Sequence, residues 1–296
     1  MSWLNLESLP AWLAWPALLS MSPLSLLTDL SLGVVLGAVG GLFGIGGGLI
    51  AIPVLALGFG LDQQLAQGTA LVMIAPNVML GFWRYKQRNP IDLKDAYWLG
   101  GAAVGSTWLV AHWATHLDAG RLRWAFAAFL VGLSMLLYWG ARRREQAVAG
   151  MAFGQSPQQL HQAAPSGHSS AGQPLSAQPA LNRPGLGALG LVSGVFSGLF
   201  TVGGGLVTVP ALTSVFGVRK QTTAQGLALA AVVPGALVAL LTYAMAGKVD
   251  WSRGLPLAAG GLLSISWGVA LAHRLPERVL GQAFCALLLV AAAMML

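Results

Sequence analysis

The stretch LFGIGGGLIAIP, from Leu42 to Pro53, places three consecutive glycines inside an apolar run, and LFTVGGGLVTVP repeats it from Leu199 to Pro210. Glycine costs about 1 kcal/mol relative to alanine in a helix interior, so each glycine run should unwind a helix locally. At membrane depth, unwound backbone is tolerated only where protein or a water-filled cavity covers it. If these runs lie in a membrane, they predict two breaks inside a helix bundle.

The composition is that of a membrane protein. Of the 296 residues, 56% are hydrophobic and 8% are charged, with a mean hydropathy of +0.70, whereas soluble domains carry about 25% charged residues. We therefore expect an all-α polytopic membrane protein embedded in the lipid bilayer. The net charge of +7 comes from short basic clusters between apolar segments, which is typical of membrane loops and not of nucleic-acid binding. The apolar segments lie at about 30–59, 65–83, 96–115, 122–140, 185–217, 222–246, 254–272 and 279–296.

Four regions follow from this pattern. Residues 1–28 are an apolar N-terminal segment, which either spans the membrane or lies at its surface. Residues 29–141 and 185–296 are two membrane repeats. Residues 142–184 are rich in Gln, Ser, Pro and Gly, a composition that buries too little apolar surface to order itself and predicts a flexible linker.

The two membrane regions are copies of each other. The glycine runs align at one constant offset in residue number, and after a single inserted residue the later matches continue. These later matches pair Gln67 with Gln225, Pro76 with Pro234, Asp92 with Asp250, Leu117 with Leu275 and Phe126 with Phe284. Internal duplication of this kind is typical of secondary transporters.

The repeats can be parallel or inverted, depending on the first segment of each. If that segment crosses the membrane once, both copies share an orientation; if it forms a broken hairpin, the second copy is inverted. The hairpin arrangement raises the number of Lys and Arg residues on the inside from ten to twelve of 16. Because cytoplasmic loops carry an excess of Lys and Arg, this count favours inverted repeats with broken hairpins.

Each break should expose the N-terminus of the half-helix that follows it, near Gly48 and Gly205. Free N–H groups and the helix dipole attract anions there, and glycine lets a substrate approach the backbone. Close helix packing is the alternative role for small residues in membrane helices. The candidate substrate-binding residues are Gly44, Gly46, Gly47, Gly48, Pro53, Gln67, Thr69, Asn77, Gly203, Gly204, Gly205, Pro210 and Gln225.

The remaining chemistry of the sequence is sparse. All nine acidic residues lie outside or at the ends of the apolar runs, and the runs contain no mid-span Lys or Arg. An anion would then be held by backbone N–H groups, amides and hydroxyls. We find no protease-type constellation, phosphate-binding loop or metal-ligand spacing, so we expect no enzyme activity, no cofactor and no metal.

The doubled G-x-G-G-G pattern with its following proline, trailed each time by an A-Q-G motif, resembles the sulfite exporter TauE/SafE family of bacterial membrane transporters. The resemblance covers about 30–140 and 185–296. It implies a multi-pass protein of the bacterial inner membrane that moves sulfite, sulfonates or other sulfur-containing anions. Thr201 and Leu227 stand where the first repeat has Gly44 and Thr69, so the two half-sites need not contribute equally.

Our leading hypothesis is therefore a secondary transporter of small anions that works by alternating access between the two repeats. An anion channel or a non-transporting membrane scaffold is the alternative.

Overall fold

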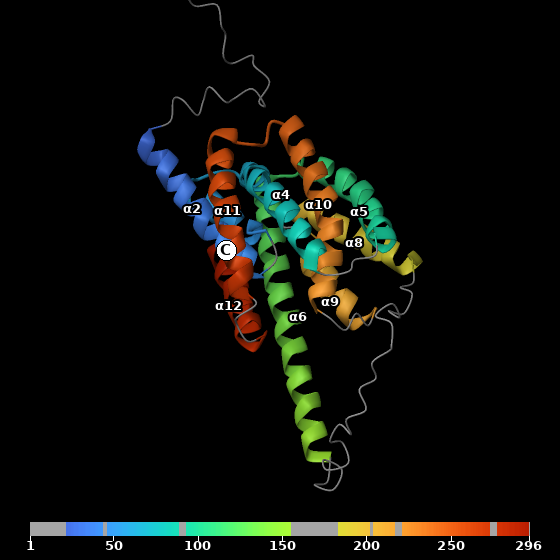
Figure 1. Cartoon of the computed structure of the whole chain (residues 1–296). Coiled ribbons are helices and arrows are strands. Elements are labelled where there is room, and N and C mark those ends of the chain that lie inside the picture. The colour runs from blue at the N-terminus through green and yellow to red at the C-terminus, as the bar shows by residue number, and fades with distance from the viewer. Residues whose placement is uncertain are drawn as a thin grey trace, which may run out of the picture.

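The computed structural model describes residues 22–43, 46–88, 93–154, 183–201, 204–216, 221–272 and 277–295, and all the regular structure of these residues is helical (Figure 1). The prediction of an all-α fold is confirmed. The first repeat contains α2 (Pro23–Phe43), α3 (Gly48–Pro53), the π-helical turn η3 (Val54–Gly58), α4 (Gln63–Arg88), α5 (Leu93–Ala114) and α6 (Ala119–Gly154). The second contains α8 (Arg183–Phe200), α9 (Gly205–Ser214), α10 (Gln221–Met245), α11 (Trp251–Ala272) and α12 (Glu277–Met295).

The duplication extends to the helix boundaries. Helix α2 ends at Phe43, and α8 ends at its sequence equivalent, Phe200. Helix α3 begins at Gly48, and α9 begins at its equivalent, Gly205. Helices α10, α11 and α12 each begin at the residue that the sequence match pairs with the first residue of α4, α5 and α6. Equivalent residues therefore occupy equivalent places in equivalent helices.

The first helix of one repeat packs on the third long helix of the other. Helices α2 and α11 lie side by side along their length (Figure 1). Glycines let the two backbones touch, because a Cβ atom on Gly37 would lie 2.5 Å from the Cα of Gly261. In order along α2, the contacts are Gly33 with Leu257, Gly37 with Gly261 and Gly41 with Ile265. Residue numbers rise together on both helices, so α2 and α11 are parallel.

Helices α8 and α5 repeat this arrangement on the other side of the molecule. Their contacts pair Gly190 with Leu99, Gly194 with Ala103 and Gly198 with Thr107. These helices are also parallel. Small residues at such interfaces are the usual means by which membrane helices approach closely.

The direction of α4 shows that the first segment of the repeat turns back. Helix α4 is parallel to α11, since Val72 contacts Gly254 and Asn77 contacts Gly261. Because α11 is parallel to α2, α4 also runs in the same direction as α2. The chain between Phe43 and Gln63 must therefore return to the side on which α2 began, as a broken hairpin does.

The second repeat is inverted relative to the first. At one end of their crossing, the Tyr243 hydroxyl of α10 donates a hydrogen bond to Gln67 of α4, and at the other end Gly81 of α4 contacts Leu229 of α10. The equivalent helices α4 and α10 are thus antiparallel. The inversion expected from the loop charges is confirmed. In this register Pro76 lies opposite its equivalent Pro234, which places the approximate twofold axis between the two prolines.

The long helices therefore form two bundles of mixed origin. We call α2, α4 and α11 the first bundle, and α8, α10 and α5 the second bundle. A separate apolar cluster fills the second bundle, with Leu99, Leu186 and Leu227 among its buried members. Helices α6 and α12 pack against each other, where the Arg123 Nε donates to the Met295 carbonyl at 2.7 Å.

In the described part of the chain, five helices are long and apolar enough to cross a membrane, and the stretches Gly48–Gly58 and Gln282–Met295 are shorter apolar helices. The five are Pro23–Phe43, Gln63–Arg84, Ala119–Leu136, Gly226–Met245 and Trp251–Leu271. Helix α6 continues to Gly154, beyond the start of the expected linker at residue 142, and extends past the other helices (Figure 1). Its sequence ARRREQAVA there is rich in good helix formers. Residues 1–21 and 155–182, which hold most of the N-terminal segment and the linker, lie outside the described residues.

Candidate functional site

The first glycine run makes a sharp reversal of the chain. A straight helix would place residue 47 about 16 Å along the axis from residue 36. Instead, a Cβ atom on Gly47 would lie only 2.7 Å from the carbonyl oxygen of Leu36. Gly46 and Gly47 have φ values of 71° and 88°, a left-handed conformation that favours glycine. The run therefore folds the chain back onto α2.

The second glycine run makes the same reversal by a different local conformation. Gly204 packs on Ser193, eleven residues earlier, as Gly47 packs on Leu36. Gly204 itself has φ −59°, so the close approach of Ser193, and not a positive φ, requires glycine there. Among the described residues of this break, Thr201 is left-handed, with φ 54°, a strained conformation for a β-branched side chain.

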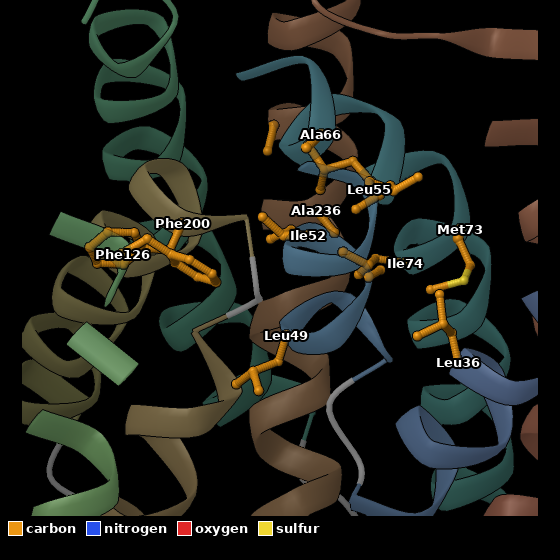
Figure 2. Packing of buried hydrophobic residues seen from close by; sticks show 14 of the residues in the cluster. Leu36, Leu49, Ile52, Leu55, Ala66, Met73, Ile74, Phe126, Phe200 and Ala236 are labelled. Carbon is orange, nitrogen blue, oxygen red and sulfur yellow. The ribbon is translucent and has the colours of Figure 1, made fainter. Parts of the chain in front are cut away.

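The two breaks contact each other in the interior of the protein. A Cβ atom on Gly48 would lie 3.9 Å from the Thr201 carbonyl oxygen, which joins the first break to the second. Figure 2 shows Leu49 and Ile52 of α3 between Phe200 of α8 on one side and Ile74 of α4 on the other, all within one apolar cluster. The two segments predicted to form halves of one site are thus neighbours.

The half-helices begin where the sequence predicts. Helix α3 starts at Gly48 and α9 at Gly205. The first acceptors of these helices are the Gly47 and Gly204 carbonyls, so the N–H groups at the very start of each helix have no acceptor within it. The α-helical hydrogen bonding of α3 ends at Pro53, where the π-helical turn η3 begins, and Pro210 lies within α9.

The glycines also serve packing. Gly48 lies against the Ile74 side chain, and in the second repeat Gly205 lies against Val232, the residue equivalent to Ile74. The contact of Gly47 with the Leu36 backbone leaves no room for a side chain. Close packing is therefore a structural role of these glycines, whatever they do for a substrate.

Asn77 is a buried amide beside the first break. It is completely buried, and neither its nitrogen nor its oxygen has a hydrogen-bond partner among the described residues. It faces Gly261 of α11, where Met73 also packs, and Met73 in turn lies 3.1 Å from the Cβ position of Gly47. Since a buried polar group is normally hydrogen-bonded, two unsatisfied atoms here are available to a ligand.

Gln67 links the two repeats. Its side-chain oxygen accepts the Tyr243 hydroxyl at 2.8 Å, while its side-chain nitrogen is buried and has no partner in the part of the chain that the structure describes. Thr69 lies against the start of α11 instead, where its hydroxyl accepts a hydrogen bond from the Asp250 N–H at 3.0 Å. The two polar residues of the AQGTAL motif thus face different helices.

Some predicted residues cannot be placed. Gly44 and Gly203 lie outside the described residues, and the side chains of Pro210 and Gln225 are not among those described.

Sequence reasoning missed polar residues of the second bundle, one of which lies at the second break. Ser193 contacts Gly204, and Ser197 and Thr107 each lie 3.3 Å from the Cβ position of Gly235. Gly235 is the equivalent of Asn77, so a hydroxyl pair stands in the second bundle where an amide stands in the first. The spacing of Ser193 and Ser197, four residues apart on one helix face, was the signal in the sequence.

One expectation about acidic residues is wrong. The apolar pattern places Asp29 just before the first apolar segment, but α2 begins at Pro23, so Asp29 is its seventh residue and is fully buried. A carboxylate so close to the edge of an apolar run does not reveal whether the helix starts before or after it.

These features define a class of protein: a polytopic membrane protein with two inverted repeats, each opening with a glycine-broken hairpin, the architecture of secondary transporters. The family model described as sulfite exporter TauE/SafE matches residues 30–295, and the chain belongs to that family. The resemblance noted in the sequence is confirmed, and the chain is a multi-pass membrane transporter protein.

Two relatives with low sequence identity each cover most of the chain. A probable membrane transporter protein of Xylella fastidiosa (strain 9a5c) is 24% identical over 257 residues, which is 84% of this chain and 86% of the relative. The probable membrane transporter protein YunE of Bacillus subtilis (strain 168) is 24% identical over 259 residues, covering 84% and 89%. No solved structure matches the chain.

Proposed function

We propose that the protein is a secondary transporter of small sulfur-containing anions such as sulfite or sulfonates, placed in a bacterial inner membrane. The observation that carries this proposal is the meeting of the two hairpin breaks at Gly48 and Thr201. Paired discontinuous helices that meet at the interface of inverted repeats are the usual binding site of such transporters. The family's description supplies the substrate class.

The groups around the breaks suit a small anion. Helix-start N–H groups, the Asn77 amide and the Ser193 hydroxyl are uncharged donors, and neutral donors hold an anion without binding it too tightly to release. The outer surface of the helices suits a bilayer. Large apolar side chains such as Trp108, Leu109 and Leu263 are more than half exposed, and such a surface calls for lipid.

Alternating access would move the two bundles, and not the two repeats, against each other. The α2/α11 and α5/α8 contacts are backbone to backbone through glycine, so each pair should move as one body. The crossing of α4 and α10 joins the two bundles through side chains, among them Gln67 with Tyr243 and the Leu229 side chain against Gly81. Each moving body would thus contain helices of both repeats.

Flux of radiolabelled sulfite into proteoliposomes tests the proposed function. A carrier should saturate with sulfite concentration and should show counterflow when the vesicles are preloaded with unlabelled sulfite. Linear flux without counterflow would indicate an anion channel, and no flux of sulfite, taurine or sulfoacetate would indicate a scaffold. Either result would overturn the proposal.

A reversible tether tests the moving bodies. Cysteines at Gly81 and Leu229, in a Cys285→Ser background, can be joined across the α4/α10 crossing by a short bifunctional methanethiosulfonate, which forms a reducible disulfide with each thiol. The tether should stop flux, and reduction should restore it, while each single cysteine treated in the same way should transport normally. Undiminished flux through the tethered protein would contradict motion between the bundles.

A further inference from the structure

Asp29 is a buried carboxylate that the anion site does not use. It lies six residues after the start of α2, about 9 Å along the helix. Its side chain has no exposed surface, and neither of its oxygens accepts a hydrogen bond from the described residues. An ionisable side chain inside a membrane span costs stability, and such residues mark ion or proton sites in transporters.

By contrast, the neighbouring carboxylate of Asp250 accepts several hydrogen bonds. Its Oδ1 accepts the backbone N–H of Ser252 at 3.1 Å, the N–H of Arg253 at 3.3 Å and the Ser252 hydroxyl. These bonds cap the start of α11. Asp250 is therefore a helix cap, and Asp29 is the carboxylate of the pair that lacks donors.

One guanidinium serves both carboxylates. Arg253 Nη1 lies 3.7 Å from Asp29, and its Nε lies 3.5 Å from Asp250. Both distances exceed the roughly 2.7–2.9 Å of a charge-assisted hydrogen bond. The guanidinium carbon also lies 4.3 Å from the centre of the Phe59 ring, which holds the side chain in place.

The cluster carries an uncompensated charge. Among the described residues, Arg253 in the first turn of α11 and its cap Asp250 are the charged groups that act on Asp29. Two carboxylates and one guanidinium leave a formal charge of −1 beside a buried carboxylate. Leaving that charge unpaired is costly, and one monovalent cation would cancel it.

We infer that Asp29 is the binding site of one monovalent cation, H⁺ or Na⁺, whose movement is coupled to that of the anion. The inference rests on the proposed transport function. A cation bound here travels with the anion and offsets its charge. Helix α2 connects the two sites, because Asp29 lies two turns before Leu36, whose carbonyl contacts Gly47 in the first break. The equivalent of Asp29 in the second repeat is Leu186, so one cation site serves the pair of breaks.

The charge-neutral variant Asp29→Asn tests the coupling. In proteoliposomes, sulfite uptake by the unaltered protein should be accelerated by an inward gradient of H⁺ alone or of Na⁺ alone, and the effective gradient identifies the cation. The variant should lose gradient-driven uptake by about tenfold or more but keep counterflow within about twofold, since exchange needs no net cation movement. Asp62→Asn, an exposed carboxylate before α4, is the matched control and should behave as the unaltered protein.

Three results would overturn the inference or separate it from the proposed function. Equal gradient-driven uptake by Asp29→Asn and the unaltered protein would overturn the cation site. If the unaltered protein shows no sulfite flux, the proposed function fails, and infrared difference spectra of the purified protein then decide about Asp29. A carboxyl band that responds to Na⁺ or to pH between about 5 and 9, and is absent in Asp29→Asn, supports the site. If the unaltered protein shows no such band, the cation site at Asp29 is overturned. This measurement does not depend on whether the Asp29→Asn variant folds.

Discussion

The Tyr243 hydroxyl donates a 2.8 Å hydrogen bond to the side-chain oxygen of Gln67, and both residues are completely buried. Tyr243 belongs to the second repeat and Gln67 to the first, so this bond joins the inverted copies at one end of the α4/α10 crossing. Gln67, which the sequence predicts as a substrate ligand, thus also connects the two repeats.

Replacing Tyr243 by phenylalanine should weaken this junction. The change leaves the Gln67 side-chain oxygen buried without a donor, which costs about 1–3 kcal/mol. The free energy of unfolding in detergent micelles should fall by that amount. Tyr97→Phe, which removes an exposed hydroxyl from α5, should leave stability unchanged, and an equal loss in both variants would show that the buried bond has no special weight.

A methyl group at Gly37 should force α2 away from α11. Its Cβ would lie 2.5 Å from the Gly261 Cα, a backbone atom that cannot turn aside. We expect Gly37→Ala to lower the unfolding free energy by about 1–3 kcal/mol, as overpacking does. Gly101→Ala on α5, where the Cβ meets nothing within 4 Å, should be neutral or stabilising by up to ~1 kcal/mol. Equal stability of the two variants would contradict the close packing of the first bundle.

Asn77→Leu separates binding from folding. The substitution keeps the branched shape of the side chain and removes two buried polar atoms that have no partner among the described residues. The unfolding free energy should therefore stay the same or rise by about 1 kcal/mol, while sulfite binding measured by isothermal titration should weaken at least about tenfold. Unchanged affinity in the stable variant would remove Asn77 from the substrate site.

Thr201→Gly should relieve backbone strain that Thr201→Val keeps. A left-handed β-branched residue stores about 1 kcal/mol or more of strain, and glycine adopts the same conformation freely. Both Thr201→Gly and Thr201→Val lose the hydroxyl bond to the Phe200 carbonyl, but only valine keeps the strain, so thermal denaturation should show a higher midpoint for glycine than for valine. A lower midpoint for glycine would mean that the strain is compensated.

Labelling of cysteines from one side of the membrane tests the inverted arrangement. In a Cys285→Ser background, cysteines at Asp62 and Ala246 should react with an impermeant thiol reagent in intact cells, and a cysteine at Lys86 should be protected. The hairpin places residues 62 and 246 on the same side, whereas a single crossing would place them on opposite sides. Reaction at only one of these two positions would therefore refute the hairpin.

The glycine runs and the loop charges predicted much of this fold. Three glycines in an apolar run leave a helix little choice but to stop, so α3 and α9 begin at Gly48 and Gly205 as expected. The partner of α2 could not be predicted. Gly33, Gly37 and Gly41 form a face that can approach another backbone. Because several helices carry a similar face, the glycine pattern does not identify which helix packs against α2.

The site was harder to predict than the fold. Asp29 is buried because α2 begins six residues before it. The hydropathy pattern does not locate the start of a helix accurately at the end of an apolar run. Thr69 fits a cavity as well as a loop by its chemistry alone, and only the tertiary contact with Asp250 decides between them. Ser193 could not be predicted as a site residue, because only the reversal of the chain brings Gly204 into contact with it.

The exchange of helices between the bundles has a consequence for synthesis of the chain. Gly33 meets Leu257, which the ribosome adds only when most of the chain has been made. Until then α2 must wait in the membrane with its glycine face and the Asp29 carboxylate lacking their lasting neighbours. A nascent chain that ends before α11 therefore leaves the glycine face of α2 without its packing partner and Asp29 without Arg253.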